Sequence, residues 1–334
     1  MGESMLERRG PVEGWAIIIL LACSPGWGTT VPATPPGGAP EEWTRLEVLE
    51  IQIALEERHF SPGLLDGIDG PKTRLAIRAL EASLGEKPTG LLSSARGILG
   101  RRGEPCTASY GITAADAAEV DPCPLDWNER SRRERLLYPT LSNLIAEKFH
   151  TSERCLAWLN PDVDLAALAP GREVVVPKPR DRPKAGVKRM EIDLSRKAVL
   201  LLGSQDRLVG LVHCSVARDT GAVTRGVHSV KTVVENPGYT FDPKKWPDVT
   251  NVERKLSIPP GPRSPVGLRW IGLDAPGVGI HGTPEPENIG KTGSHGCFRL
   301  TNWDAVHVAA SVEVGTRVRV VDSSPVAESL GTEP

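Results

Sequence analysis

The chain has 334 residues, more than one hydrophobic core usually holds, so two or three domains are expected. Its 34 glycines and 30 prolines predict many turns and at least one linker, whereas a hydrophobic fraction of 39% still allows compact folding. The formal net charge of -2 is too small to favour binding to nucleic acid, so we expect no nucleic-acid partner.

Residues 1–28 have the pattern of an export signal. Arg8 and Arg9 precede an apolar run over residues 15–22, which has the length of a signal-peptide core and is too short to span a bilayer. No later apolar stretch is long enough to cross a membrane. Residues 29–42 are rich in proline, glycine and threonine and predict a flexible linker. We therefore expect the protein in the periplasm or the cell envelope.

Two forms of this signal fit the residues. Leu20-Leu21-Ala22-Cys23 resembles a bacterial lipobox, in which Cys23 becomes the lipidated first residue of the mature protein and its membrane tether. An ordinary signal, cleaved between Ala22 and Gly28, fits equally well. Export is common to both.

Residues 43–95 predict a small helical bundle. Pro71 is suited to open its second helix, after a loop rich in Asp-Gly pairs. The segment 64–77, in which this loop runs into Gly-Pro-Lys-Thr-Arg, resembles the helical peptidoglycan-binding module of bacterial wall enzymes. Asp69 and the loop glycines, taken singly, are explained more simply as parts of the turn. The apolar residues at helical spacing are Leu46, Leu49, Ile53, Ala76, Ile77, Leu80 and Leu84.

Residues 96–136 predict no clear structure and are interpreted as a poorly defined connector. Residues 137–178 predict two short helices, the second capped by Thr151, followed by a strand at 174–177. This unit resembles a LysM repeat, a small α+β module that binds glycan, although no first strand is evident before the helices. The basic, proline-bearing residues 179–186 predict a linker.

Residues 187–322 predict a mainly-β domain. Apolar and polar residues alternate from Met190 to Leu194, and several short strands separated by turns favour a sandwich or barrel. One helix is predicted to begin at Thr301, which forms a capping-box pattern with Asp304. Residues 323–334 predict a disordered tail. The expected fold is thus multidomain: a small α-helical bundle, a small α+β LysM-like module and a mainly-β C-terminal domain.

Two motifs in this last domain supply residue types for nucleophilic catalysis. They are Ile280-His281-Gly282-Thr283 and Ser294-His295-Gly296-Cys297-Phe298-Arg299-Leu300. A cysteine reacts as its thiolate, and a neighbouring imidazole can lower its pKa and carry the proton. His281, sixteen positions before Cys297, and the adjacent His295 are both candidates for this base. Gly282 and Gly296 leave backbone groups open to a ring or an oxyanion.

Other interpretations of these residue types exist. A catalytic zinc with His281, His295 and Cys297 as ligands fits their chemistry. The short spacing makes His295 and Cys297 poor joint ligands, so no metal and no cofactor are predicted. A lone buried cysteine is also usually inert packing. Structural roles are expected for the three histidines His213, His228 and His307.

Together the two motifs resemble the signature of L,D-transpeptidase catalytic domains of the YkuD type, over residues 187–321. The resemblance implies that Cys297 is the acyl-accepting nucleophile and that His281 is its base, oriented by the carbonyl of Gly282. The backbone N–H groups of Gly296 and Cys297 would form an oxyanion hole. Substrate contacts are implied for His295, Arg299, Ser294 and Asn302. The chain departs from the family at Thr224-Arg225-Gly226, where Thr-Pro-x-Gly is common.

The remaining cysteines are expected to be structural. An exported protein can oxidise a pair of them, and we favour Cys106 with Cys123 because these two bracket a proline-rich stretch. The sequence leaves open other pairings that involve Cys155. Cys214 lies in an apolar alternation, which favours a buried strand position.

The resemblance implies acyl transfer. Cys297 would attack the amide between the diamino acid and the terminal D-alanine of a peptidoglycan tetrapeptide stem, releasing D-alanine and leaving a thioester. An amine of another stem, an amine of a protein, or water would then resolve it, so an L,D-carboxypeptidase is an alternative. A non-catalytic wall-binding protein is another, against which the presence of Cys297, His281 and His295 argues. The expected partners are peptidoglycan stem peptides and glycan, and we expect a monomer.

Overall fold

The computed structural model describes six stretches of the chain, all but Glu42 within a compact unit that spans residues 43–334. The predicted signal and lipobox, and all of the predicted N-terminal linker but Glu42, lie outside the described residues, as do Cys123, Ser294 and His295. In the described part of the chain, we find no helix with the length and apolarity needed to cross a membrane. The described stretches are 42–101, 103–122, 126–217, 223–246, 249–291 and 296–331.

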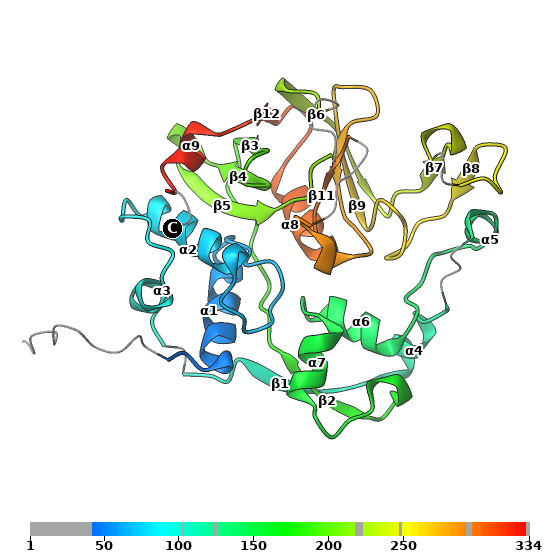
Figure 1. Cartoon of the computed structure of the whole chain (residues 1–334), viewed down its shortest axis with the longest axis horizontal. Coiled ribbons are helices and arrows are strands. Elements are labelled where there is room, and N and C mark those ends of the chain that lie inside the picture. Colours follow the sequence, from blue (N-terminus) through cyan, green and yellow to red (C-terminus); the bar gives the residue numbers. More distant parts are fainter. Residues whose placement is uncertain are drawn as a thin grey trace, which may run out of the picture. The chain divides into compact units, whose positions relative to one another are not determined.

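Three helices form the N-terminal module: α1 (Arg45–Glu57), α2 (Pro71–Ser83) and α3 (Leu92–Leu99) (Figure 1). Helix α1 begins after Thr44, which forms a reciprocal capping box with Glu47. Helix α2 opens at Pro71, as its residues predict. The sequence did not predict α3, whose short apolar stretch packs on α1 and α2. Leu46 and Leu84, expected in the bundle's apolar face, are 47% and 53% exposed.

A unit with two paired strands and several short helices between them follows. Strand β1 (Thr107–Gly111) pairs antiparallel with β2 (Glu173–Pro177), and between them lie α4 (Ala114–Ala118), α5 (Trp127–Ser131), α6 (Leu141–Lys148), α7 (Glu153–Leu159) and the 3-10 helix η1 (Leu165–Ala167). Strand β1 lies within residues 96–136, the stretch interpreted as a poorly defined connector. Its sequence Thr-Ala-Ser-Tyr-Gly lacks apolar alternation, because only its tyrosine packs on the local core.

The start of α7 also corrects an expectation. The residue that caps α7 is Ser152, whose side chain accepts a hydrogen bond from the Cys155 N–H. Thr151, the predicted cap, instead donates its hydroxyl proton to the carbonyl oxygen of Leu65 at 2.6 Å. Both residues are compatible with an N-cap, and the contact with the loop before α2 decides between them.

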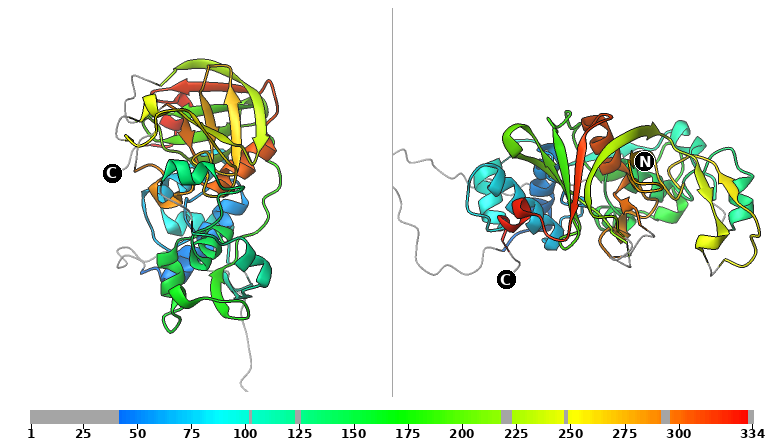
Figure 2. Two further views of the ribbon diagram at one scale, coloured as in Figure 1. Left: turned by 90° about the vertical axis from the view of Figure 1, so that its right-hand side faces the viewer. Right: turned by 90° about the horizontal axis from the view of Figure 1, so that it is seen from above.

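The C-terminal domain is built on one eight-stranded sheet in the order β11-β10-β9-β6-β12-β3-β4-β5. Neighbouring strands are antiparallel except for the parallel pairs β12–β3 and β10–β11. Figure 2 shows the twist of this sheet. An antiparallel bridge between Ser215, just after β5, and Arg299 of β11 joins the two edges of this curled sheet, which agrees with the barrel among the expected folds. Its strands are β3 (Arg189–Asp193), β4 (Ala198–Leu202), β5 (Leu208–His213), β6 (Gly226–Glu235), β9 (Arg269–Leu273), β10 (Gly279–His281), β11 (Phe298–Arg299) and β12 (Arg317–Val321).

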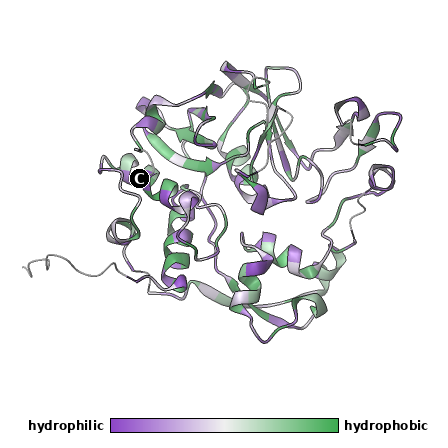
Figure 3. Ribbon diagram, in the orientation of Figure 1, coloured by the Kyte–Doolittle hydropathy of each residue, from purple (hydrophilic) through white to green (hydrophobic). Residues whose placement is uncertain are grey.

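Both faces of the sheet are covered along β4. Val199 and Leu201 join the core that the sheet shares with α8 (Asn302–Ser311), whereas Ala198, Leu200 and Leu202 join the core with α1 and α2. This explains why all five residues of β4 are buried and why the strand is coloured as apolar in Figure 3. The helical module thus packs directly on the sheet.

Helix α8 confirms the predicted capping signal. Its N-cap is Thr301, whose hydroxyl accepts a hydrogen bond from the Asp304 N–H at 3.1 Å. The Asp304 carboxylate does not complete the box. It accepts hydrogen bonds from Ser61, beside the helical module, and from Arg182, in the stretch predicted as a linker, at 2.8 and 2.9 Å. The start of α8 is therefore tied to two other parts of the chain.

A small hairpin of β7 (Tyr239–Phe241) and β8 (Leu256–Ile258) extends from the domain, with the 3-10 helix η4 (Pro243–Lys245) between its strands. Trp127 of α5 stacks on Phe241, with ring centroids 4.2 Å apart. Two further 3-10 helices, η2 (Ser204–Asp206) and η5 (Pro286–Asn288), lie in loops.

The predicted disordered tail is wrong for its described residues. Helix α9 (Pro325–Glu328) is capped by Ser324, and the side chains of Ala327 and Leu330 are fully buried in the core shared with α1 and α2. The alternating polar composition of this short segment gave no signal for helix, because its burial depends on residues far away in sequence.

Candidate active site

The pairing of β10 with β11 brings the two sequence motifs together. His281, the last residue of β10, is in register with Arg299 of β11, and Ile280 is in register with Phe298. Cys297 immediately precedes β11 and stands two positions before Arg299. Alternate residues of a strand project to the same face, so this register favours the same face of the sheet for Cys297 and His281.

The imidazole of His281 is held by its own backbone neighbour. Its Nδ1 lies 2.7 Å from the carbonyl oxygen of Gly282, and only an N–H can form a hydrogen bond there, so Nδ1 carries the proton. Nε2 is left as the basic nitrogen. Burial lowers the pKa of His281 to about 4; the bond to Gly282 opposes this and the positive charge of Arg299 adds to it. His281 is therefore neutral at neutral pH and able to accept a proton.

Trp270 also restrains this ring, through a contact that sequence reasoning did not identify. It is the register partner of His281 on β9, and the two rings stack with centroids 5.6 Å apart at an interplanar angle of 20°. Only the pairing of β9 with β10 reveals this contact.

Asn302, the first residue of α8, fixes the backbone around Gly282. Its Oδ1 accepts a hydrogen bond from the Leu268 N–H at 3.0 Å, and its Nδ2 donates to the carbonyl of Pro262 at 3.2 Å. A Cβ atom on Gly282 or on Gly267, where φ is +59°, would overlap Oδ1. The amide thus packs against the residue that orients His281. Substrate contact had been predicted for Asn302, and the structure shows a buried side chain with structural partners.

Cys297 is half-buried, and its Sγ lies 3.4 Å from the carbonyl oxygen of Gly277. The preceding residue, Gly296, has φ of +144°, a conformation that side chains rarely adopt. Burial raises the pKa of the Tyr239 phenol in the hairpin, and negative charge on Cys297 adds a smaller effect in the same direction.

Arg299 lies beside His281, and its backbone is fixed by Ser215. The two residues exchange backbone hydrogen bonds of 2.9 and 3.0 Å. Burial lowers the pKa of the Arg299 guanidinium, and the Glu285 carboxylate opposes this. Ser294 and His295, the other predicted substrate contacts, fall on residues that the structure does not describe.

The loop that departs from the family pattern has its own anchor. Arg225 pairs with Asp322 through Nη2 and Oδ1 at 2.7 Å, and its Nη1 donates to the carbonyl of Val223. These bonds connect the loop to the segment after β12, away from the two catalytic motifs in sequence.

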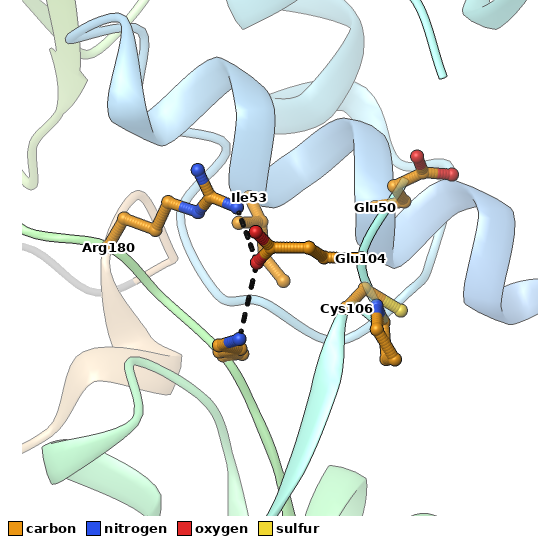
Figure 4. A pocket seen from close by; sticks show the side chains of 7 residues that line it. Glu50, Ile53, Glu104, Cys106 and Arg180 are labelled. Carbon is orange, nitrogen blue, oxygen red and sulfur yellow. Dashed lines mark hydrogen bonds and ion pairs between the residues drawn. The ribbon is translucent and has the colours of Figure 1, made fainter. Parts of the chain in front are cut away.

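The other cysteines have free thiols in the described part of the chain. Cys155 and Cys214 are buried, and burial raises the pKa of both thiols, as expected for inert packing. Cys106 lies at a small hollow between α1 and the strand that follows Glu104, where its Sγ is 3.7 Å from the Leu46 carbonyl oxygen (Figure 4). Its pairing with Cys123 stays a prediction, because Cys123 is outside the described residues.

The loop of the helical module is organised by Gln52 of α1. The Gln52 Oε1 accepts hydrogen bonds from the N–H groups of Asp66 and Gly67, and its Nε2 donates to Asp66 and to the Ile68 carbonyl. Asp69 forms an ion pair of 3.0 Å with Arg74. These contacts agree with the simpler interpretation, in which the aspartates of the motif build the turn.

Comparison with known proteins identifies two parts of the chain, the C-terminal domain and the N-terminal helical module. A family model of the L,D-transpeptidase catalytic domain, YkuD, matches residues 188–320, and one of a peptidoglycan binding domain matches residues 44–95. The L,D-transpeptidase YqjB of Bacillus subtilis is 34% identical over 134 residues, which are 38% of this chain and 68% of that protein. The L,D-transpeptidase YkuD of Bacillus licheniformis is 28% identical over 176 residues, 53% of this chain and 90% of that protein.

The similarity to solved structures is weaker. The NMR structure of the catalytic domain from the E. faecium L,D-transpeptidase has 22% sequence identity and a TM-score of 0.32, covering 41% of this chain and 98% of that chain. The family assignment therefore rests on sequence, namely on one relative that is 34% identical over two thirds of its length and on the matching model of the catalytic domain. This chain belongs to the L,D-transpeptidase family of enzymes and carries an N-terminal peptidoglycan-binding domain.

Proposed function

We propose that this enzyme is an exported L,D-transpeptidase in which Cys297 forms an acyl-enzyme with peptidoglycan tetrapeptide stems. The observation that carries the proposal is the hydrogen bond from His281 Nδ1 to the Gly282 carbonyl at 2.7 Å, on the strand that pairs with β11 next to Cys297. This bond leaves Nε2 of a neutral imidazole as a base. A thiol with such a base is the arrangement that nucleophilic acyl transfer requires.

The first half-reaction follows from these groups. The Cys297 thiol gives its proton to His281 Nε2, and the thiolate attacks the carbonyl of the amide between the diamino acid and D-alanine. The backbone N–H groups of Gly296 and Cys297 stabilise the oxyanion. His281 then returns the proton to the leaving amine, the C–N bond breaks, and D-alanine departs from a thioester on Cys297.

The second half-reaction passes the acyl group to an amine and regenerates the thiol. His281 takes a proton from the attacking amine and the thiolate leaves. A stem-peptide amine gives a 3-3 cross-link, and a protein amine gives attachment of that protein. Water in place of an amine would make the enzyme an L,D-carboxypeptidase. We propose contacts to the substrate from His295, Arg299 and Ser294.

We also propose that the chain acts in the cell envelope, as a monomer, with its N-terminal modules holding it on the wall. The export pattern in residues 1–28 supports this, either as a cleaved signal or with Cys23 lipidated. The matched peptidoglycan binding domain supplies one contact with the polymer. The paired strands β1 and β2, with α6 and α7 between them, support a LysM-like module as a second contact, with glycan.

The test is intact-mass analysis of purified protein with a tetrapeptide stem and, separately, with a carbapenem. The wild-type enzyme should gain the mass of the acyl group and release D-alanine. Cys297→Ala should fold and show no mass increase, because the nucleophile is gone. Cys214→Ala, a buried thiol outside the motifs, is the matched control and should behave like wild type. An acylated Cys297→Ala protein would refute the mechanism, and the products, dimeric or trimmed stems, identify the acceptor.

A further inference from the structure

Asn302 has a third partner, which comes from outside the catalytic domain. Its Nδ2 donates to Glu147 Oε1 at 2.9 Å as well as to the Pro262 carbonyl. Glu147 lies on α6, between the two strands of the small α+β unit, 155 positions away in sequence. Both side chains are buried.

The orientation of the Asn302 amide depends on these contacts. One end must accept from the Leu268 N–H, and the other end must donate to Glu147 and Pro262. An amide in the opposite orientation would place its NH2 group against an N–H and its oxygen against two acceptors. Of the two acceptors, only Glu147 can carry charge, which makes its hydrogen bond the stronger one.

The amide in turn packs against the residue that orients the catalytic base. Asn302 Oδ1 fills the space where side-chain atoms would stand on Gly282 and Gly267. The Gly282 carbonyl holds His281 Nδ1. A continuous set of contacts therefore runs from Glu147 through Asn302 and Gly282 to His281.

We propose that Glu147 is a positioning residue for catalysis, through which the small α+β unit before the catalytic domain holds His281 in its productive orientation. The inference rests on the proposed function for the identity of the base and nucleophile. It goes beyond that function because it makes the proton transfer at Cys297 depend on a residue of another module. Docking of that module then becomes a condition for full activity.

The surroundings of Glu147 allow its charge to change near neutral pH. Tyr138 donates its hydroxyl proton to the same Oε1 at 2.9 Å, and Arg263 and His150 are the charged or titratable groups that act on it electrostatically. Burial raises the pKa of Glu147 to about 7, against the lowering effect of the bonds from Asn302 and Tyr138. Glu147 and Asn302 both line a cleft of about 490 Å³, which gives protons a route to the carboxylate.

The ionised carboxylate accepts a stronger hydrogen bond than the neutral acid, so Asn302 is held most firmly above pH 7. Glu147→Gln keeps an acceptor oxygen and is neutral at every pH, so it imitates the protonated form. Glu147→Ala removes the acceptor altogether. We therefore expect His281 to be held most firmly in the wild type, less firmly in Glu147→Gln and least firmly in Glu147→Ala.

The experiment measures alkylation of Cys297 by iodoacetamide between pH 5.5 and 9, followed by mass mapping of the peptide that contains Cys297. This readout reports the reactivity of the thiol and needs no peptidoglycan substrate. We expect Glu147→Ala to slow alkylation at pH 8 by about tenfold, the effect of losing one charge-assisted hydrogen bond. The ratio of the wild-type rate to the Glu147→Gln rate should be near one below pH 6 and rise through about pH 7, following the titration of Glu147.

Glu153→Ala is the matched control, because Glu153 is a carboxylate of the same unit that accepts its hydrogen bonds from Ser142 and Thr140. It should lower the thermal unfolding midpoint without changing the pH profile of alkylation. A ratio that stays constant with pH overturns the proposal, whether or not Glu147→Ala folds. Carbapenem acylation of the wild type is scored separately: its failure would refute the proposed function and leave the alkylation result to decide the role of Glu147.

Discussion

Single residues around His281 fix the chemistry of the site more tightly than the motifs suggested. Sequence reasoning identified His281 and Gly282, and the structure adds why they work together: one ring nitrogen is tied to a backbone carbonyl, and burial keeps the ring neutral. The stacking of Trp270 on the ring adds a further restraint. Asn302, expected to contact substrate, has backbone and carboxylate partners instead.

Gly282→Ala tests this close packing. A methyl group at this position would overlap Asn302 Oδ1, so the backbone must shift and the carbonyl must lose its alignment with His281 Nδ1. We expect carbapenem acylation to slow by about 100-fold, as for other small misplacements of catalytic groups, and the effect to be larger on rate than on stability. Stopped-flow measurement of acylation gives the rate.

Gly97→Ala, in helix α3 of the N-terminal module, serves as a control for the loss of a glycine, since a Cβ there meets no atom within 4 Å. Neither Gly282 nor Gly97 has a positive φ, so the two variants differ in the overlap with Asn302 and not in backbone strain. Equal acylation rates for the two variants would contradict the role assigned to the contact between Gly282 and Asn302.

At the scale of elements, α8 connects the stability of the fold to the site. Its capping residue Thr301 stands two positions after the end of β11, and its first residue is Asn302. The predicted capping pattern was confirmed at Thr301, because capping is a local interaction that four residues determine. The two-sided burial of β4 was not predicted, because it needs both α8 and the helical module in place.

Thr301→Ala should lower the stability of the enzyme by about 1 kcal/mol, the usual cost of losing an N-cap side chain. Thr301→Ser keeps the hydroxyl that accepts from the Asp304 N–H and should retain most of the stability. Thermal unfolding midpoints of the two variants give the comparison. A midpoint for Thr301→Ala equal to that of wild type would show that the cap contributes nothing here.

At the scale of the whole molecule, three buried histidines make the fold sensitive to acid. Burial lowers the pKa of His281 to about 4 and those of His213 and His307 to about 3, from an ordinary value of 6.5. As the pH falls below 6.5, these histidines become protonated in the unfolded chain while they stay neutral in the folded protein. Each histidine therefore lowers the free energy of unfolding progressively, until the pH reaches its pKa in the folded state. Glu147 acts in the opposite direction, because its raised pKa favours the folded state below pH 7.

We expect the histidines to outweigh Glu147, since three groups oppose one. The thermal unfolding midpoint should fall between pH 6.5 and pH 4, with each histidine contributing about 1 to 3 kcal/mol at the acidic end. His213→Gln keeps a donor for the Lys72 carbonyl and should make this decline shallower. A midpoint that stays level or rises toward pH 4 would contradict the assignment of neutral buried histidines.

The sequence by itself determined what depends on neighbouring residues: the opening of α2 at Pro71, the cap of α8 and the paired motifs that mark the family. These signals are local in sequence, so they do not need the rest of the fold. Only the tertiary structure revealed the pairing of β1, the folding of the tail into α9, and the contacts of Trp270 and Glu147. Each of these depends on a partner distant in the chain, such as β2 for β1 or Asn302 for Glu147, and sequence periodicity carries no information about which distant residues meet.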